Sequence, residues 1–178
     1  MTDMPYDSPS QSVMLIGLMG SGKTVIGRML AQAYGWQFAD SDKTIEDESN
    51  LRITDIFDLF GEPKFREMER RIIGELIGYD QHIISVGGGA FCQPDIRAAA
   101  KGSVITIWLR ATPSELLSRM DNLSSRPLLA GDNPLAILQR LHKERFDDYS
   151  QADITIDTDG LSLRQSLDRV MAALAKAS

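Results

Sequence analysis

Short apolar runs alternate along the chain with longer segments in which apolar residues recur every three or four positions. The short runs predict buried strands, and the longer segments predict amphipathic helices. This alternation is typical of a parallel sheet that helices cover. The expected strands are residues 13–18, 36–39, 82–86, 104–109 and 154–157. The pattern therefore predicts an α/β fold with a five-stranded sheet.

Seven segments carry the spacing expected of helices that bury one face. They are a segment from Lys23 to a stop at Gly35, residues 54–60 and 63–77, a segment from Pro94, and residues 112–120, 134–149 and 162–174. Residues 121–133 gather turn-forming residues around a few apolar ones, which predicts a mobile loop. Helices between all the strands would give a three-layer domain.

Length and composition favour one soluble domain. A chain of 178 residues can bury a sizeable core without a metal or a disulfide. Residues 1–12 have neither the basic nor the apolar region of a secretory signal, so we expect a disordered extension before a single domain at residues 13–178. The apolar runs are far shorter than the ~20 residues that cross a bilayer.

Charge and cysteine content exclude several classes of partner. The formal net charge is -6 and the pI is about 4.9, whereas nucleic acids and membrane surfaces are bound by basic fields. We therefore expect neither partner, and any anionic ligand must be held by a local group of cations. Cys92 has no second cysteine to pair with, and two histidines are too few for a His/Cys metal site. This content suits the cytoplasm and leaves Cys92 without a chemical role.

The segment GLMGSGKT at residues 17–24 has the spacing of a phosphate-binding loop. It lies between a predicted strand and a predicted helix, where backbone N–H groups and the helix N-terminus can surround phosphate oxygens. Lys23 would reach the β- and γ-phosphates, and the Thr24 hydroxyl would ligate Mg²⁺. The alternative is a glycine-rich turn without a ligand. The expected ATP-binding residues here are Gly20, Ser21, Gly22, Lys23, Thr24 and Val25.

Two aspartates follow the second predicted strand. Asp40 and Asp42 are two residues apart, so in an extended chain both point to one side, toward the edge where open α/β sheets bind ligands. One could hold the water shell of the metal, and the other could orient a substrate hydroxyl. Alternatively, both residues cap the next helix.

Further candidates are a glycine triplet, 87–89, and three arginines. The triplet follows the third predicted strand, where it could form a simple turn or let a ligand approach the backbone. Arg66 and Arg145 could clamp a carboxylate, and Arg126 could close over the phosphates. The alternative is that all three are surface arginines, with Arg66 paired to Glu69.

Several segments in order give the chain a specific family resemblance. They are GLMGSGKT, FADSDKTIE, GEPKFREMER, VGGGA, RPLL and KERFDDYSQAD. With these, the chain resembles shikimate kinase from Val13 to near its end. The resemblance implies a sheet order of 2-3-1-4-5, an arrangement like that of nucleoside monophosphate kinases, and a monomer.

The same resemblance implies roles for individual residues. Asp42 would bind the hydroxyls of shikimate, Asp40 would help to place Mg²⁺ through water, and Arg119 would stack on adenine. Phe57 and Phe65 match an aromatic wall of the substrate pocket, although their spacing also fits core packing. The remaining implied contacts are Arg66 and Arg145 with the shikimate carboxylate, Gly88 through its backbone, Gly87 and Gly89 in the same turn, and Arg126 in the lid with ATP.

The expected reaction transfers the γ-phosphoryl group of Mg-ATP to the 3-hydroxyl of shikimate, with Lys23, Asp42 and Arg126 as catalytic residues. Shikimate and ATP are the expected small-molecule partners. A gluconate kinase on the same scaffold is the nearest alternative, because gluconate is also a hydroxylated carboxylate. A nucleotide-dependent module without catalysis is another, but such a module would need no clamp for a carboxylate.

Overall fold

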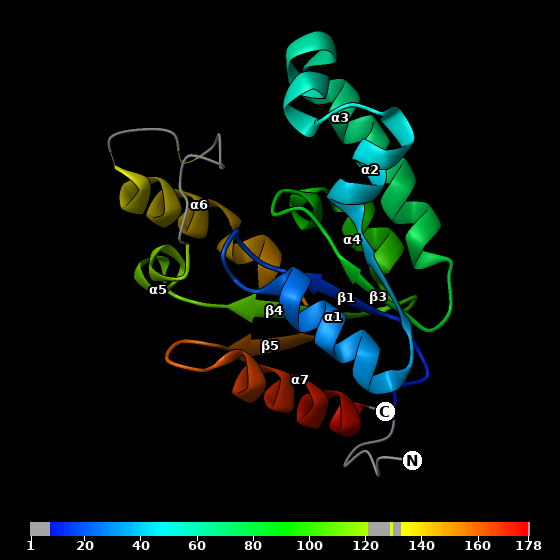
Figure 1. Ribbon diagram of the computed structural model, residues 1–178, viewed down its shortest axis with the longest axis vertical. Helices are drawn as coiled ribbons and strands as arrows, with labels where there is room; N and C mark the ends of the chain where they lie inside the picture. The colour runs from blue at the N-terminus through cyan, green and yellow to red at the C-terminus, as the bar shows by residue number, and fades with distance from the viewer. Residues whose placement is uncertain (1–7, 121–128, 130–132, 178) are drawn as a thin grey trace.

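One parallel sheet organises the molecule. The computed structural model describes residues 8–120, 129 and 133–177. Its sheet has the order β2-β3-β1-β4-β5 with every neighbouring pair parallel (Figure 1), which confirms the predicted fold. The strands are β1 (Val13–Ile16), β2 (Gln37–Asp40), β3 (His82–Ser85), β4 (Ile105–Arg110) and β5 (Ile154–Asp157).

Helices cover both faces of the sheet. Figure 1 shows α1 and α7 along one face, with α3, α4 and α6 on the other. No helix in the described part of the chain is both long and apolar enough to cross a membrane. The helices are α1 (Lys23–Tyr34), α2 (Ser41–Ser49), α3 (Ile53–Ile77), α4 (Pro94–Ala100), α5 (Pro113–Ser118), α6 (Pro134–Tyr149) and α7 (Leu163–Ala177), with a 3-10 turn η1 (Ala90–Cys92).

Strand β1 lies at the centre of two cores. Val13 and Leu15 pack into the core that α1 and α7 complete, whereas Met14 and Ile16 pack into the core on the opposite face. All four side chains are buried, as expected of a central strand in a parallel sheet. The loop that follows Ile16 therefore starts from a buried strand that is paired on both sides.

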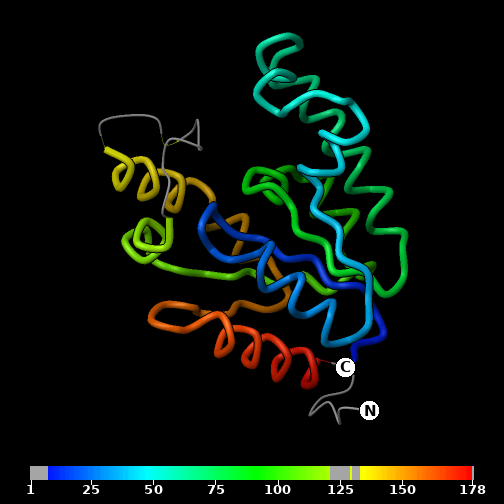
Figure 2. Tube along the Cα trace, in the orientation of Figure 1, coloured from blue at the N-terminus to red at the C-terminus, as the bar shows by residue number. Residues whose placement is uncertain are grey.

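Helix α3 contains the break that the sequence predicted between two helices. Gly61 has non-helical backbone angles (φ 78°, ψ 168°), and Pro63 follows it. Figure 2 shows α2 and the first part of α3 extending beyond the sheet. This part of α3 exposes Leu59 and Phe60, while the part after the break packs on the sheet.

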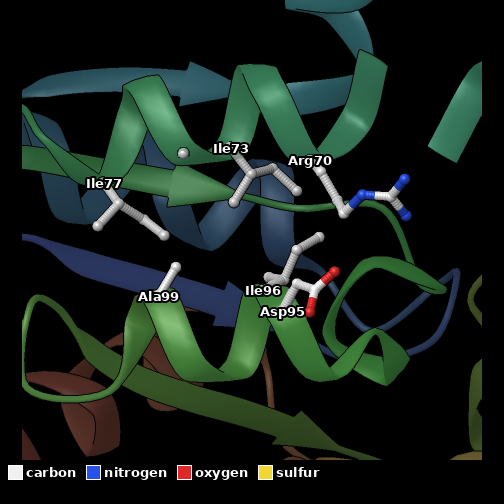
Figure 3. A pocket seen from close by; sticks show the side chains of 7 residues that line it. Arg70, Ile73, Ile77, Asp95, Ile96 and Ala99 are labelled. Carbon is white, nitrogen blue, oxygen red and sulfur yellow. The ribbon is translucent and has the colours of Figure 1, made fainter. Parts of the chain in front are cut away.

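A small cavity of about 60 Å³ separates α3 from α4. Its walls are mostly apolar (Figure 3), with Arg70 and Asp95 at one end. The other lining residues are Ile73, Gly74, Ile77, Ile96 and Ala99. The cavity reflects an incomplete fit between the two helices and shares no residue with the candidate site below.

Residues 8–12 already contact the domain, which differs from the expected extension through residue 12. Pro9 is buried, and the Ser12 hydroxyl donates to the carbonyl oxygen of Tyr79 (2.7 Å) and accepts from the N–H of His82 (2.9 Å). Residues 1–7 of that extension lie outside the described residues. Of the loop predicted at residues 121–133, only Leu129 and Asn133 are described.

Candidate functional site

The phosphate-binding loop connects β1 to α1 at the carboxyl edge of the sheet. Gly22 occupies the N-cap of α1 with φ 90°, a conformation that favours glycine because a Cβ atom would strain it. Lys23 and Thr24 follow in the first turn of α1. The loop thus brings a cation, a hydroxyl and the positive end of the helix dipole to one place.

The Lys23 ammonium bends back over this loop. Its Nζ donates to the carbonyl oxygens of Gly17 (2.8 Å) and Leu18 (3.1 Å). These bonds hold the charge on the inner side of the loop. Ser21 is also buried here, and its hydroxyl has no hydrogen-bond partner among the described residues.

Asp40 serves two purposes with its two oxygen atoms. Oδ1 accepts the N–H groups of Asp42 (3.1 Å) and Lys43 (3.4 Å) and so caps α2. Oδ2 accepts the hydroxyl of Thr24 at 3.1 Å. Asp40 therefore caps α2, as the capping alternative expected of it, and also contacts the threonine of the phosphate loop; its role toward Mg²⁺ stays a prediction.

Thr24 and Asp40 fit a site for Mg²⁺. Their paired oxygen atoms are the hard donors that Mg²⁺ prefers, and the ion usually completes its shell with water and substrate phosphates. No cluster of three His, Cys, Asp or Glu residues that could hold a metal occurs among the residues that the structure describes. A metal bound here would therefore complete its shell with oxygens from outside the protein, such as those of water or phosphate.

Asp42 reaches the site from a helix. The extended geometry expected for this residue is wrong, because β2 ends at Asp40 and α2 begins at Ser41. Burial, and then the negative charges of Asp40 and Glu69, raise the pKa of Asp42 to about 6. Its Oδ1 is buried without a hydrogen-bond partner among the described residues. The site thus holds a carboxylate oxygen that can accept a hydrogen bond from a ligand.

Arg66 is held by a chain of polar contacts. Its Nη1 donates to Oε2 of Glu69 at 2.6 Å, and a second side of the guanidinium contacts Glu62. Glu69 is only 1% exposed, and burial raises its pKa although Arg66 bonds to it. Gln93 donates to the same Oε2 at 2.6 Å. The predicted Arg66–Glu69 pair is therefore present, and Gln93 supports it from behind.

The glycine triplet makes room for three side chains of the site. A Cβ atom on Gly87 would lie 2.8 Å from Oδ1 of Asp42. One on Gly88 would lie 2.9 Å from Nη1 of Arg145, and one on Gly89 would lie 2.7 Å from Nη2 of Arg66. A side chain at any position of the triplet would thus displace one of these three groups from its present place.

One cavity of about 1280 Å³ joins the phosphate loop to these groups. Every predicted site residue that the structure describes lines it, whereas Arg126 lies outside the described residues. The predicted residues along its wall are Gly20, Ser21, Gly22, Lys23, Thr24, Val25, Asp40, Asp42, Arg66, Gly87, Gly88, Gly89, Arg119 and Arg145. The cavity has room for a nucleotide and a small acceptor side by side.

Comparison with known proteins identifies the group that shares this arrangement. The shikimate kinase family matches residues 19–175 of the chain. The shikimate kinase of Ruegeria pomeroyi is 40% identical over 166 residues, which cover 93% of this chain and 85% of that protein. The chain belongs to the shikimate kinase family. As a member, it is an ATP-dependent kinase, which confirms the resemblance found in the sequence.

Solved structures support the same family. The structure of the shikimate kinase from Acinetobacter baumannii in complex with shikimate has a TM-score of 0.89 and 32% identity, and the match covers 95% of each chain. A gluconokinase from Sinorhizobium meliloti reaches a TM-score of 0.64 at 20% identity, over 96% of this chain and 95% of that one. At this identity, the similarity to the gluconokinase shows a shared fold and nothing about a shared substrate.

Arg119 lies at the nucleotide end of this shikimate kinase family site. Its guanidinium donates to the hydroxyl (3.1 Å) and carbonyl oxygen (2.5 Å) of buried Thr158, and Glu115 accepts from its Nε. Leu161, in the loop after β5, and Leu163, the first residue of α7, line the same cavity. The stacking of Arg119 on adenine stays a prediction.

Phe57 and Phe65 form an aromatic pair at the opposite end. Their ring centroids are 4.7 Å apart, and both residues line the cavity. Phe65 is buried, whereas Phe57 is 36% exposed. Phe65 therefore combines core packing with a place in the wall, so the two alternatives from the sequence do not exclude each other.

Sequence reasoning missed two residues that support this end of the site. Gln93 bonds to Glu69, and Tyr149 on α6 donates its hydroxyl to the carbonyl oxygen of Gly88. Gln93 lies outside the quoted segments, and Tyr149 lies within KERFDDYSQAD, where only Arg145 was given a role. A buried tyrosine one helical turn after Arg145 was the one available signal, because a buried hydroxyl needs a partner.

Proposed function

We propose that this chain transfers the γ-phosphoryl group of ATP to the 3-hydroxyl of shikimate, giving shikimate 3-phosphate and ADP. The observation that carries the proposal is the convergence of two arginines and a buried aspartate on the cavity that holds the phosphate loop. A hydroxylated carboxylate matches this set, because it offers one anion and several hydroxyls. Family membership and the shikimate named with the Acinetobacter baumannii structure support the choice of acceptor.

Arg66 and Arg145 would bind the carboxylate of the acceptor. Both line the cavity, and each lies against one glycine of the triplet. A guanidinium binds a carboxylate through two parallel hydrogen bonds. Gly88 would add a contact through its backbone, with Gly87 and Gly89 shaping the turn. These contacts would fix the ring of the acceptor and with it the direction of the hydroxyl groups.

Asp42 would orient the hydroxyl that attacks. Its Oδ1 is buried and has no hydrogen-bond partner in the described part of the chain, so a substrate hydroxyl would fill that place. With a pKa of about 6, Asp42 is mostly ionised at neutral pH. It could therefore accept the hydroxyl proton as the oxygen bonds to phosphorus.

Lys23 would neutralise charge on the transferred group. Its ammonium lies at the start of α1 beside the loop carbonyls, where the γ-phosphate of ATP is expected. Thr24 and Asp40 would hold Mg²⁺, directly and through water respectively. The ion supplies charge neutralisation between the β- and γ-phosphates. Arg126, which lies outside the described residues, remains a predicted contact to ATP.

A coupled ADP-release assay tests the proposal. The purified protein would be given Mg-ATP with shikimate, gluconate or a nucleoside monophosphate in turn. We expect turnover with shikimate that far exceeds the rate with the other acceptors. Turnover with gluconate but not shikimate would overturn the proposed acceptor.

A second experiment separates an enzyme from a nucleotide-dependent module. Isothermal titration would measure shikimate binding with and without ADP. We expect a shikimate site in at least one nucleotide state, because the arginines and Asp42 have no evident purpose in a module that binds only ATP. Binding of Mg-ATP without any shikimate site would favour the module.

We further propose that the protein acts as a cytoplasmic monomer without nucleic-acid or membrane partners. The net charge of -6 supports this proposal, because it disfavours polyanionic surfaces. Light scattering on the eluting protein would test it. A dimer mass that persists on dilution would contradict the monomer.

A further inference from the structure

Tyr149 is a buried tyrosine whose hydroxyl group faces the glycine triplet. Its side chain is 1% exposed and packs against Trp108 with ring centroids 5.6 Å apart. The hydroxyl donates to the carbonyl oxygen of Gly88. Gly88 lines the large cavity and Tyr149 does not. The carbonyl of Gly88 is therefore directed away from the cavity and toward α6.

The direction of this carbonyl fixes the direction of an amide. The peptide bond between Gly88 and Gly89 is trans, so the N–H of Gly89 points opposite to the carbonyl of Gly88. That N–H has no hydrogen-bond partner among the described residues. It belongs to a residue of the cavity wall that lies against the guanidinium of Arg66. The amide and the guanidinium are thus donors side by side.

We infer that Tyr149 is a positioning residue for the acceptor site: its hydroxyl holds the peptide between Gly88 and Gly89 so that the N–H of Gly89 faces the carboxylate of the substrate. The inference rests on the proposed function, since it needs an anionic acceptor beside Arg66. A glycine pair without side chains can rotate its shared peptide at little cost. A fixed hydrogen bond on the carbonyl side removes that freedom before the substrate binds.

Helix α6 makes this arrangement rigid. Arg145 lies one turn before Tyr149, and its Nη1 approaches Gly88 from the same helix. Burial raises the pKa of Tyr149 to about 12, so the hydroxyl keeps its proton and remains a donor at any pH at which a kinase is assayed. One helix thus supplies both a charged ligand for the acceptor and the support for a backbone ligand.

Tyr149→Phe tests this inference, because it removes the hydroxyl and keeps the ring against Trp108. We expect the KM for shikimate to rise about tenfold, the usual value of one lost hydrogen bond, with the KM for ATP unchanged. Tyr34→Phe is the matched control: the Tyr34 hydroxyl is buried without a partner among the described residues. Its loss should leave both KM values unchanged.

A second readout covers the case in which Tyr149→Phe weakens the fold. With ¹⁵N-glycine labelling, the Gly89 amide resonance should shift when shikimate is added to the parent protein, and this shift should shrink in Tyr149→Phe at temperatures well below its melting transition. An unchanged KM for shikimate together with an unchanged Gly89 shift would overturn the inference and leave Tyr149 as a packing residue. Absence of shikimate turnover in the parent protein would instead refute the proposed function.

Discussion

Two glycine-rich segments border the same cavity, yet they need glycine for different reasons. In the phosphate loop, Gly20 and Gly22 have φ values of 80° and 90°, which residues with a Cβ atom rarely adopt. In the triplet 87–89, no φ is positive. There the obstacle is space, because a Cβ atom would meet Asp42, Arg145 or Arg66 within 3 Å.

This difference separates a local site from an assembled one. The phosphate loop carries its backbone conformation, its cation and its hydroxyl within one short segment. The acceptor end takes side chains from α2, α3 and α6 and brings them to the end of β3. Nucleotide binding should therefore be lost mainly through substitutions within the phosphate loop. Acceptor binding should be lost through substitutions on α2, α3, α6 or the turn after β3.

Lys23→Ala is the change with the largest expected effect, and it breaks the local end alone. We expect kcat to fall by about a thousandfold or more, because preorganised charge near the transferred phosphoryl group is lost. Shikimate affinity, measured by titration, should stay within twofold. Lys43→Ala is the control, since this exposed lysine pairs with Asp47 on the surface. Loss of shikimate binding in Lys23→Ala would show that the two ends are not separable.

Asp42→Asn should weaken activity and strengthen the fold. The pKa of Asp42 rises from 3.8 to about 6, so the folded state disfavours its charge. Removing that charge should raise the unfolding free energy by about 3 kcal/mol at pH 7.5.

The stability gain from Asp42→Asn should depend on pH. Below pH 6 folded Asp42 binds a proton that the unfolded chain does not, which stabilises the parent protein as pH falls toward 4. We expect the gain to fall to about half by pH 5 in urea denaturation. A gain that does not change between these two pH values would contradict a buried charge at Asp42.

Arg145→Ala tests the assembled end. We expect the KM for shikimate to rise about a hundredfold, because a charged hydrogen-bonded pair is broken, while the KM for ATP stays within twofold. Arg140→Ala, on the exposed side of the same helix, should leave both values unchanged. The reverse pattern, with ATP affected and shikimate spared, would refute the role of Arg145.

A double-mutant comparison separates the two reasons for glycine. Gly89→Ala should raise the KM for shikimate about tenfold by displacing Arg66. In an Arg66→Ala background it should have almost no further effect, because the obstacle is gone. Gly22→Ala strains the backbone whatever its neighbours, so its cost should add fully to that of Arg66→Ala. If both glycine substitutions added their full effect to that of Arg66→Ala, the two segments would not need glycine for different reasons.

Gly74→Ala should have the smallest effect and the opposite sign. This glycine lies inside α3 with ordinary helical angles, and a Cβ atom there would meet nothing within 4 Å. The small cavity of Figure 3 lies beside it. We expect stabilisation of up to about 1 kcal/mol by thermal or urea denaturation. Gly27→Ala on α1 is the control and should destabilise, because its Cβ atom would lie 2.6 Å from Phe38.

The sequence predicted the fold and the nucleotide end more fully than the acceptor end. The alternating runs predict strands and helices because both are determined by residues that are close together in the sequence. The same holds for the phosphate loop. The geometry of Asp42 was wrong because the chain turns into a helix one residue earlier than an extended strand would allow. The convergence of Arg66 with Arg145, and the support from Gln93 and Tyr149, depend on packing between distant elements. No local pattern encodes these contacts.

Asp40 links the nucleotide end and the acceptor end of the site through hydrogen bonds. One oxygen of this carboxylate anchors the first turn of α2, which carries Asp42, and the other anchors Thr24 of the phosphate loop. A ligand that draws the Thr24 hydroxyl toward itself would weaken its hydrogen bond to Asp40. Asp40 could then shift, and with it the N-terminus of α2 that carries Asp42. Nucleotide and acceptor should therefore affect each other's affinity through a single side chain, even without touching.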